Sequence, residues 1–276
     1  MRSLIHLLFI LLPVQSSYIF SYPANIYKKK FNTKIIKIYE PENIQKNNLP
    51  CLLFFTGANS IIPGDIYNNF ISSLVDYKFS VSVLPNDLQA SYEYIRTIED
   101  EYSSIIVIAH SSGCVNAINL ANNFKNIKKA IFLDPVDNSK LFNIFNNIHN
   151  EKLFYLKDLL IITAEKSYKW SIDPFIIPFV PAFRLNMKKL LYLKSDLNIE
   201  YIESEEHGHC DILDSLWADL MHGTIAKGVD NRDYKNLHLY HNWLTQQIHN
   251  FIFRDENENN YSPCSFEDSD STQDTY

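Results

Sequence analysis

The chain has 276 residues, of which 46% are hydrophobic and 14% aromatic, enough for one large globular domain with a substantial core. Its formal net charge is −7, and residues 255–276 hold seven acids and no lysine or arginine. The rest of the chain is therefore close to neutral, which excludes the basic surface of a nucleic acid-binding protein. We expect 255–276 to form a disordered, solvated acidic tail.

Residues 1–16 have the pattern of a signal peptide. Arg2 precedes an apolar run at 4–14, and the small residues Ser16 and Ser17 follow it. The run is too short to cross a bilayer as a helix. We expect cleavage and entry into the secretory pathway, with secretion as the destination, or a plastid if the signal is the first half of a bipartite address. The alternative is a buried N-terminal strand or an uncleaved anchor.

The domain at 17–254 alternates apolar runs of strand length with helical stripes. Residues 26–39 favour an edge strand or a hairpin. Buried strands are predicted at 51–55, 80–85, 105–108, 129–133, 159–165 and 198–202, and helices at 65–76, 88–102, 115–121 and 234–253. Strands alternating with helices predict an α/β fold, a mostly parallel sheet with helices on both faces.

A buried strand, a tight turn and a helix follow one another around Ser111. The turn reads small-x-Ser-x-Gly, with Ala109 and Gly113 as the small residues. This order is that of the nucleophile elbow of the α/β-hydrolase fold, where a strained turn requires small neighbours. A nucleophile at Ser112 would put His110 in a small position, so the pattern favours Ser111.

The loop after the strand at 51–55 is the candidate for the oxyanion hole. It reads Thr56-Gly57-Ala58, and in α/β-hydrolases the corresponding loop supplies one of two backbone donors. The donors would be the N–H groups of Ala58 and Ser112. An ordinary turn at a strand end is the alternative.

The acid that orients the catalytic base has three candidates. Asp134 and Asp137 follow the strand at 129–133, and Glu165 ends the strand at 159–165. All lie close to the carboxyl ends of strands, where the catalytic groups of open α/β sheets gather. A solvent-facing carboxylate or a turn residue is the alternative for each.

His207 and His209 both follow the last predicted strand, and either is a candidate base. Serine, acid and histidine in this chain order are typical of α/β-hydrolases. An imidazole can take the serine proton near neutral pH, and a carboxylate holds the correct tautomer. This chemistry needs no cofactor or metal, and the spacing of the four cysteines matches no zinc site.

Two blocks of the sequence resemble chlorophyllase. Residues 131–137 read I-F-L-D-P-V-D and residues 208–214 read G-H-C-D-I-L-D, where that family has D-P-V-D-G and Y-G-H-L-D-M-L-D. The resemblance runs in order over about 51–253. It implies that Asp134 is the acid, that His209 is the base, and that the substrate is the phytyl ester of chlorophyll. Lipases of the pancreatic type are similar in reading D-P after the strand.

The chain departs from chlorophyllase around the elbow and the oxyanion loop. The family reads G-H-S-R-G-G at the elbow, whereas here Ala109 replaces the first Gly, Ser112 the Arg and Cys114 the last Gly. Thr56 replaces the His of the family's H-G loop. A serine ester hydrolase is expected, with two alternatives to a chlorophyllase-like activity: a lipase or esterase on long-chain apolar esters, or an inactive hydrolase-fold protein that binds its ligand.

Residues 166–189 are too rich in proline for a helix and too apolar for a solvated loop. They follow a predicted strand at the catalytic edge, where loops shape the substrate pocket. We expect a hydrophobic pocket or lid for an apolar ester, with transient contact with a membrane or lipid surface; closure of the core is the alternative. The expected pocket residues are Trp170, Phe175, Phe179 and Phe183.

Overall fold

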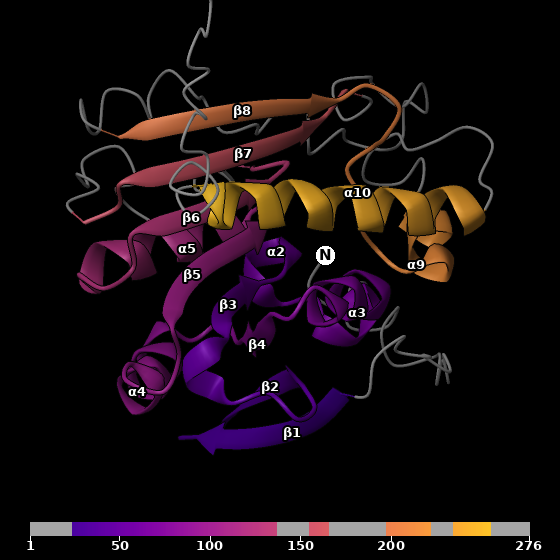
Figure 1. The fold of residues 1–276 in the computed structure, drawn as a ribbon. Helices are drawn as coiled ribbons and strands as arrows, with labels where there is room; N and C mark the ends of the chain where they lie inside the picture. Colours follow the sequence, from indigo (N-terminus) through magenta and orange to yellow (C-terminus); the bar gives the residue numbers. More distant parts are fainter. Residues whose placement is uncertain (1–23, 137–154, 166–196, 222–233, 255–276) are drawn as a thin grey trace, which may run out of the picture.

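The computed structural model describes residues 24–136, 155–165, 197–221 and 234–254 (Figure 1). Within them, eight strands form one sheet in the order β1-β2-β4-β3-β5-β6-β7-β8. The strands are β1 Ala24–Phe31, β2 Lys34–Pro41, β3 Pro50–Phe55, β4 Ser80–Leu84, β5 Ser104–His110, β6 Lys129–Leu133, β7 Asp158–Ala164 and β8 Asn198–Ser204. From β4 to β8 all neighbours are parallel, whereas β2 pairs antiparallel with β1 and β4. The predicted mostly parallel sheet is confirmed.

The longer helices lie where the apolar spacing predicts them. The helical elements are η1 Lys46–Asn48, α2 Gly57–Ser60, η2 Gly64–Tyr67, α3 Asn68–Asp76, α4 Leu88–Ile98, α5 Gly113–Asn123, α9 Ser215–Met221 and α10 Tyr234–Ile252. The carboxylate of Asp87 caps α4 by accepting the N–H of Ala90 at 3.1 Å. The sequence did not predict α2 and α9, because elements of one or two turns show no clear apolar period.

The core has two layers, one on each face of the sheet. In β3, the side chains of Cys51, Leu53 and Phe55 pack in the layer on the face covered by α4 and α5. Those of Leu52 and Phe54 pack in the layer on the opposite face, which α3 and α10 cover. All five are fully buried. Since side chains alternate along a strand, this unbroken apolar run requires helices on both faces, as predicted.

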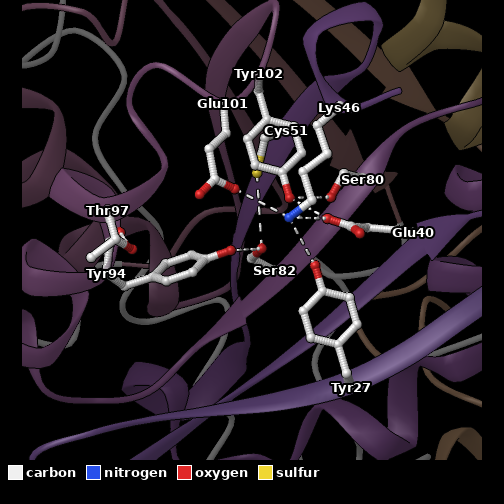
Figure 2. A network of polar contacts seen from close by, with 10 residues as sticks. All are labelled: Tyr27, Glu40, Lys46, Cys51, Ser80, Ser82, Tyr94, Thr97, Glu101 and Tyr102. Carbon is white, nitrogen blue, oxygen red and sulfur yellow. Dashed lines mark hydrogen bonds and ion pairs between the residues drawn. The ribbon is translucent and has the colours of Figure 1, made fainter. Parts of the chain in front are cut away.

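A polar network joins the β1–β2 hairpin to the rest of the sheet, at the end where the parallel strands β3 and β4 begin (Figure 2). Lys46 Nζ lies 3.2 Å from Tyr27 Oη, 3.2 Å from the Glu40 carboxylate and 3.1 Å from that of Glu101. Tyr102 also donates to Glu40, which is buried. Burial raises the pKa of Tyr27 to about 12, so its phenol stays neutral. The network satisfies a buried carboxylate at the end of the sheet opposite the candidate site, and we assign it a structural role.

None of the helices in these ranges is long and apolar enough to cross a membrane. The predicted signal peptide at 1–16, the acidic tail at 255–276 and the apolar segment at 166–189 all lie outside the described residues.

Candidate active site

Ser111 occupies a sharp turn between β5 and α5. Its φ is +56°, in the left-handed region that non-glycine residues rarely adopt. Its N–H donates to the carbonyl of Leu133 at 3.0 Å, and its own carbonyl accepts the N–H of Val136 at 3.2 Å. Such a conformation costs about 1–3 kcal/mol and persists only where its surroundings hold it. Here the bonds to the end of β6 hold the serine in the strained turn.

Gly113 is required by the close approach of β3 to the elbow. A Cβ atom at this position would lie 2.4 Å from the carbonyl oxygen of Thr56 and 2.7 Å from that of Phe55. Both are backbone atoms that a side-chain rotation cannot move. Ala109 precedes the turn, still within β5, and its methyl group packs in the α4–α5 layer of the core. The alanine at that position is therefore compatible with the turn.

The structure brings Ser111, His209 and Asp134 into one hydrogen-bonded chain. His209 Nε2 lies 2.9 Å from Ser111 Oγ, and His209 Nδ1 lies 2.5 Å from Asp134 Oδ2. A carboxylate only accepts, so Nδ1 carries the proton and Nε2 is free to accept the serine O–H. Asp134 Oδ1 accepts the N–H of Ala164 at 3.2 Å, and all three side chains are buried.

The alternative residues lie elsewhere. Glu165 follows β7, but the carboxylate that contacts His209 is that of Asp134; Asp137 is outside the described residues. His207 Nδ1 is 2.7 Å from Ser204 Oγ, and its ring stacks on Tyr240 with centroids 3.8 Å apart. Of the two histidines, His209 is thus the one that the structure brings to the serine.

Two carboxylates of the G-H-C-D-I-L-D block support the loop that carries His209. Asp211 Oδ2 accepts the N–H of Gly208 at 2.7 Å. Asp214 accepts the N–H of Asn69 at 2.9 Å and that of Asn68 at 3.3 Å, at the start of α3. The sequence reasoning missed these roles, although the spacing of the two acids was visible. They explain why this block needs acids: one closes the loop, and the other ties it to a helix N-terminus.

The candidate oxyanion loop packs directly against the elbow. Ala58 lies in α2, immediately after β3, with φ of +50°, and Ser112 is the N-cap residue of α5. Helices α2 and α5 are in contact. The hydroxyl of Thr56 closes the loop by donating to the carbonyl of Ile62 at 2.6 Å. Thus Ala58 and Ser112 belong to adjoining turns beside the nucleophile position.

A cavity of about 290 Å³ lies beside the oxyanion loop and the hairpin, at the small end of the range for small-molecule pockets. Its lining is mostly apolar, with charged groups at Lys28, Lys37 and Asp65. The other lining residues are Ile35, Thr56, Ser60, Ile61, Ile62, Pro63, Gly64, Val83, Leu84 and Pro85. The predicted pocket residues Trp170, Phe175, Phe179 and Phe183 lie outside the described residues.

Within the described ranges, no three His, Cys, Asp or Glu side chains are grouped as metal ligands. Cys51, Cys114 and Cys210 are each buried, and none of the three forms a disulfide. Burial raises the pKa of Cys51 to about 12, so this thiol is unreactive at neutral pH. Burial also raises the pKa of Cys114 well above its usual value, so neither of these two thiols is a nucleophile at neutral pH.

Comparison with known proteins extends the description of the fold. No family model and no curated protein sequence matches the chain. Among solved structures, a thermostable esterase from Pseudomonas putida ECU1011 is similar over 86% of this chain and 85% of its own, with a TM-score of 0.54 and 12% identity. A putative esterase from Staphylococcus aureus has a TM-score of 0.54 at 11% identity, covering 83% of this chain and 84% of its own.

The esterase Pf2001 from Pyrococcus furiosus is similar over 87% of this chain and 97% of its own, with a TM-score of 0.53 and 11% identity. At these identities the likeness shows the fold and no more. Together with the strand order and the serine turn, it shows that this chain has the α/β-hydrolase fold.

Proposed function

We propose that the protein is a serine carboxylic-ester hydrolase that works through an acyl-enzyme. The observation that carries this proposal is the buried chain of hydrogen bonds from Ser111 through His209 to Asp134. The fold shared with solved esterases supports it, as does the elbow geometry of the serine.

In the proposed reaction, Ser111 Oγ attacks the ester carbonyl carbon while His209 Nε2 takes the hydroxyl proton. Asp134 keeps Nδ1 protonated and stabilises the imidazolium that forms. The N–H groups of Ala58 and Ser112 stabilise the tetrahedral oxyanion. His209 then gives the proton to the departing alcohol, and a water molecule releases the acid by the same steps. Every proton is carried by a residue of the chain, so the mechanism requires no cofactor.

The finer proposal is a chlorophyllase-like activity, cleaving chlorophyll to chlorophyllide and phytol. It rests on the D-P-V-D and G-H-C-D-I-L-D blocks and on the apolar composition of 166–189. A substrate of this kind is held in a lipid phase, so we propose transient contact with a lipid surface. The signal-peptide pattern at 1–16 is the basis for proposing entry into the secretory pathway. A lipase or esterase acting on other long-chain apolar esters is the second candidate, favoured by the missing arginine at Ser112.

A fluorophosphonate probe and three substrates test the proposal. Purified wild type should be labelled and should cleave p-nitrophenyl butyrate, and Ser111→Ala should do neither while keeping its circular dichroism spectrum. Chlorophyll a and a medium-chain triglyceride are compared under the same conditions. Chlorophyllide formation that is lost in Ser111→Ala supports the finer proposal, whereas triglyceride cleavage with chlorophyll untouched favours a lipase.

Equal labelling of wild type and Ser111→Ala would contradict the hydrolase assignment. A stable complex with an apolar ester and no turnover would then point to a binding protein on this fold.

A further inference from the structure

His110 directly precedes Ser111. Its side chain points to the face of the sheet opposite to that of Ala109, toward Tyr67. It is 3% exposed. Its ring packs beside that of His209, with centroids 4.7 Å apart and planes inclined by 34°. The candidate base therefore has a second imidazole as its neighbour.

Both ring nitrogens of His110 have partners, which fixes the tautomer. Nε2 lies 3.0 Å from the backbone carbonyl oxygen of His209, and Nδ1 lies 2.9 Å from Tyr67 Oη. A carbonyl oxygen only accepts, so Nε2 carries the proton and Nδ1 accepts the O–H of Tyr67. Tyr67 Oη in turn accepts the N–H of Gly57 at 3.0 Å.

These bonds form one relay from the oxyanion loop to the base. It runs from Gly57 N–H to Tyr67, then to His110, and ends at the carbonyl of His209. Gly57 is the residue before Ala58, the candidate oxyanion donor. A Cβ atom on Gly57 would lie 3.1 Å from Tyr67 Oη and 3.3 Å from His110 Nδ1, so the loop rests closely on the relay.

The surroundings of His110 disfavour a charge on it. Burial, followed by the proximity of His209, lowers its pKa to about 3, against the smaller opposing effects of the Asp134 carboxylate and of the hydrogen bond to the His209 carbonyl. The titratable groups that face His110 are Tyr67 from η2, His209 from the loop after β8 and Asp134 from the end of β6. A neutral His110 does not repel the imidazolium that His209 forms during proton transfer.

We propose that Tyr67 and His110 are positioning residues for ester hydrolysis, which hold the oxyanion loop and the base loop in register with Ser111. This rests on the proposed function. The two loops are joined to each other here by neutral hydrogen bonds through η2 and β5, and no charged group is needed. Misplacing a reacting group by about 1 Å can cost on the order of a hundredfold in rate.

A purely structural role for Tyr67 is the competing explanation, because its ring also packs edge-on against Phe54 with centroids 5.2 Å apart. Tyr94 provides a matched control. Its buried Oη bonds Ser82 Oγ at 2.6 Å on the other face of the sheet. Tyr67→Phe and Tyr94→Phe thus each remove one buried hydroxyl, but only the first interrupts the relay.

We expect Tyr67→Phe to lower kcat for p-nitrophenyl butyrate about 10- to 100-fold with KM changed less than threefold. Tyr94→Phe should leave kcat within about twofold of wild type, although both variants lower the melting temperature. His110→Gln, whose amide can still donate to the His209 carbonyl, should retain more activity than His110→Ala. Equal kcat in Tyr67→Phe and Tyr94→Phe would overturn the positioning role.

A second readout does not depend on turnover. By ¹⁵N NMR, His110 should be the neutral Nε2–H tautomer without titration between pH 8 and 5, and the downfield Nδ1–H resonance of His209 should weaken or move in Tyr67→Phe. An unmoved His209 resonance, or a charged His110, overturns the proposal. If wild type neither labels nor cleaves esters, the proposed function fails, while the NMR experiment still decides whether the relay positions His209.

Discussion

Replacing Asp134 by Asn tests the candidate site with little other disturbance. Asn has nearly the same size and tolerates the left-handed backbone of this residue, whose φ is +42°. Its carbonyl oxygen can still accept the N–H of Ala164, now at 3.2 Å from Asp134 Oδ1. Its NH₂ group would then face His209 Nδ1, which lies 2.5 Å from Asp134 Oδ2.

An NH₂ group facing Nδ1 selects the wrong tautomer of His209. Nδ1 must then accept, so Nε2 carries the proton and cannot take the one from Ser111 Oγ, 2.9 Å away. Loss of the correct tautomer in such a triad costs on the order of 10⁴ in kcat. That factor corresponds to about 5 kcal/mol of transition-state stabilisation.

The assay is steady-state hydrolysis of p-nitrophenyl butyrate, with the rate of fluorophosphonate labelling as a second measure. Asp134→Asn should lose about 10³- to 10⁴-fold in kcat with KM little changed. Glu165→Gln and Asp137→Asn are the matched controls, expected to stay within about threefold of wild type. A crippled Glu165→Gln beside an active Asp134→Asn would refute the assignment of the acid.

Two further predictions concern stability. Gly113→Ala puts a methyl group 2.4 Å from the carbonyl oxygen of Thr56, so urea unfolding should show a loss of about 1–3 kcal/mol or more together with lost activity; unchanged stability would mean that β3 and the elbow are not in contact. The buried His241 donates from Nε2 to the carbonyl of Asp211, and burial lowers its pKa to about 4. Between pH 6.5 and 4 the unfolded chain therefore binds a proton at this histidine that the folded chain does not. The free energy of unfolding accordingly decreases as the pH is lowered from 6.5 to about 4. His241→Gln should remove up to about 1.4 kcal/mol per pH unit from that slope in unfolding measured between pH 6.5 and 4, and an unchanged slope would contradict the buried, neutral state.

The sequence by itself determined the strands and the longer helices of the fold. Apolar runs such as 105–108 can only be buried on both faces, and the helical stripes supply the layers that bury them. The turn at Ser111 was visible for the same reason, since a strand, small residues and a helix are all local features. Local patterns of this kind need no knowledge of which strands are neighbours.

The sequence favoured Asp134 and His209 through a resemblance to chlorophyllase, but only the tertiary structure shows which candidates meet. Strand β6 pairs with β5 so that Leu133 lies opposite His110. Ser111 follows β5 and Asp134 follows β6, so the two residues come at the same edge of the sheet on neighbouring strands. The end of β7, with Glu165, lies one strand further away. Strand order is a property of long-range pairing, which no local pattern contains.

Long-range contacts also decide between the two histidines and form the relay at Tyr67. His207 and His209 are two residues apart in one loop, and apart from the resemblance of the G-H-C-D-I-L-D block to chlorophyllase, which favours His209, nothing in their sequence surroundings separates them. They are separated by distant partners: Tyr240 stacks on His207, while Asp214 anchors the loop of His209 to the start of α3. Tyr67 meets the histidine before the serine across 43 positions of sequence. Hydrogen bonds between residues so far apart in the sequence depend on how the sheet and its two helical layers pack, because packing brings their donors and acceptors within reach.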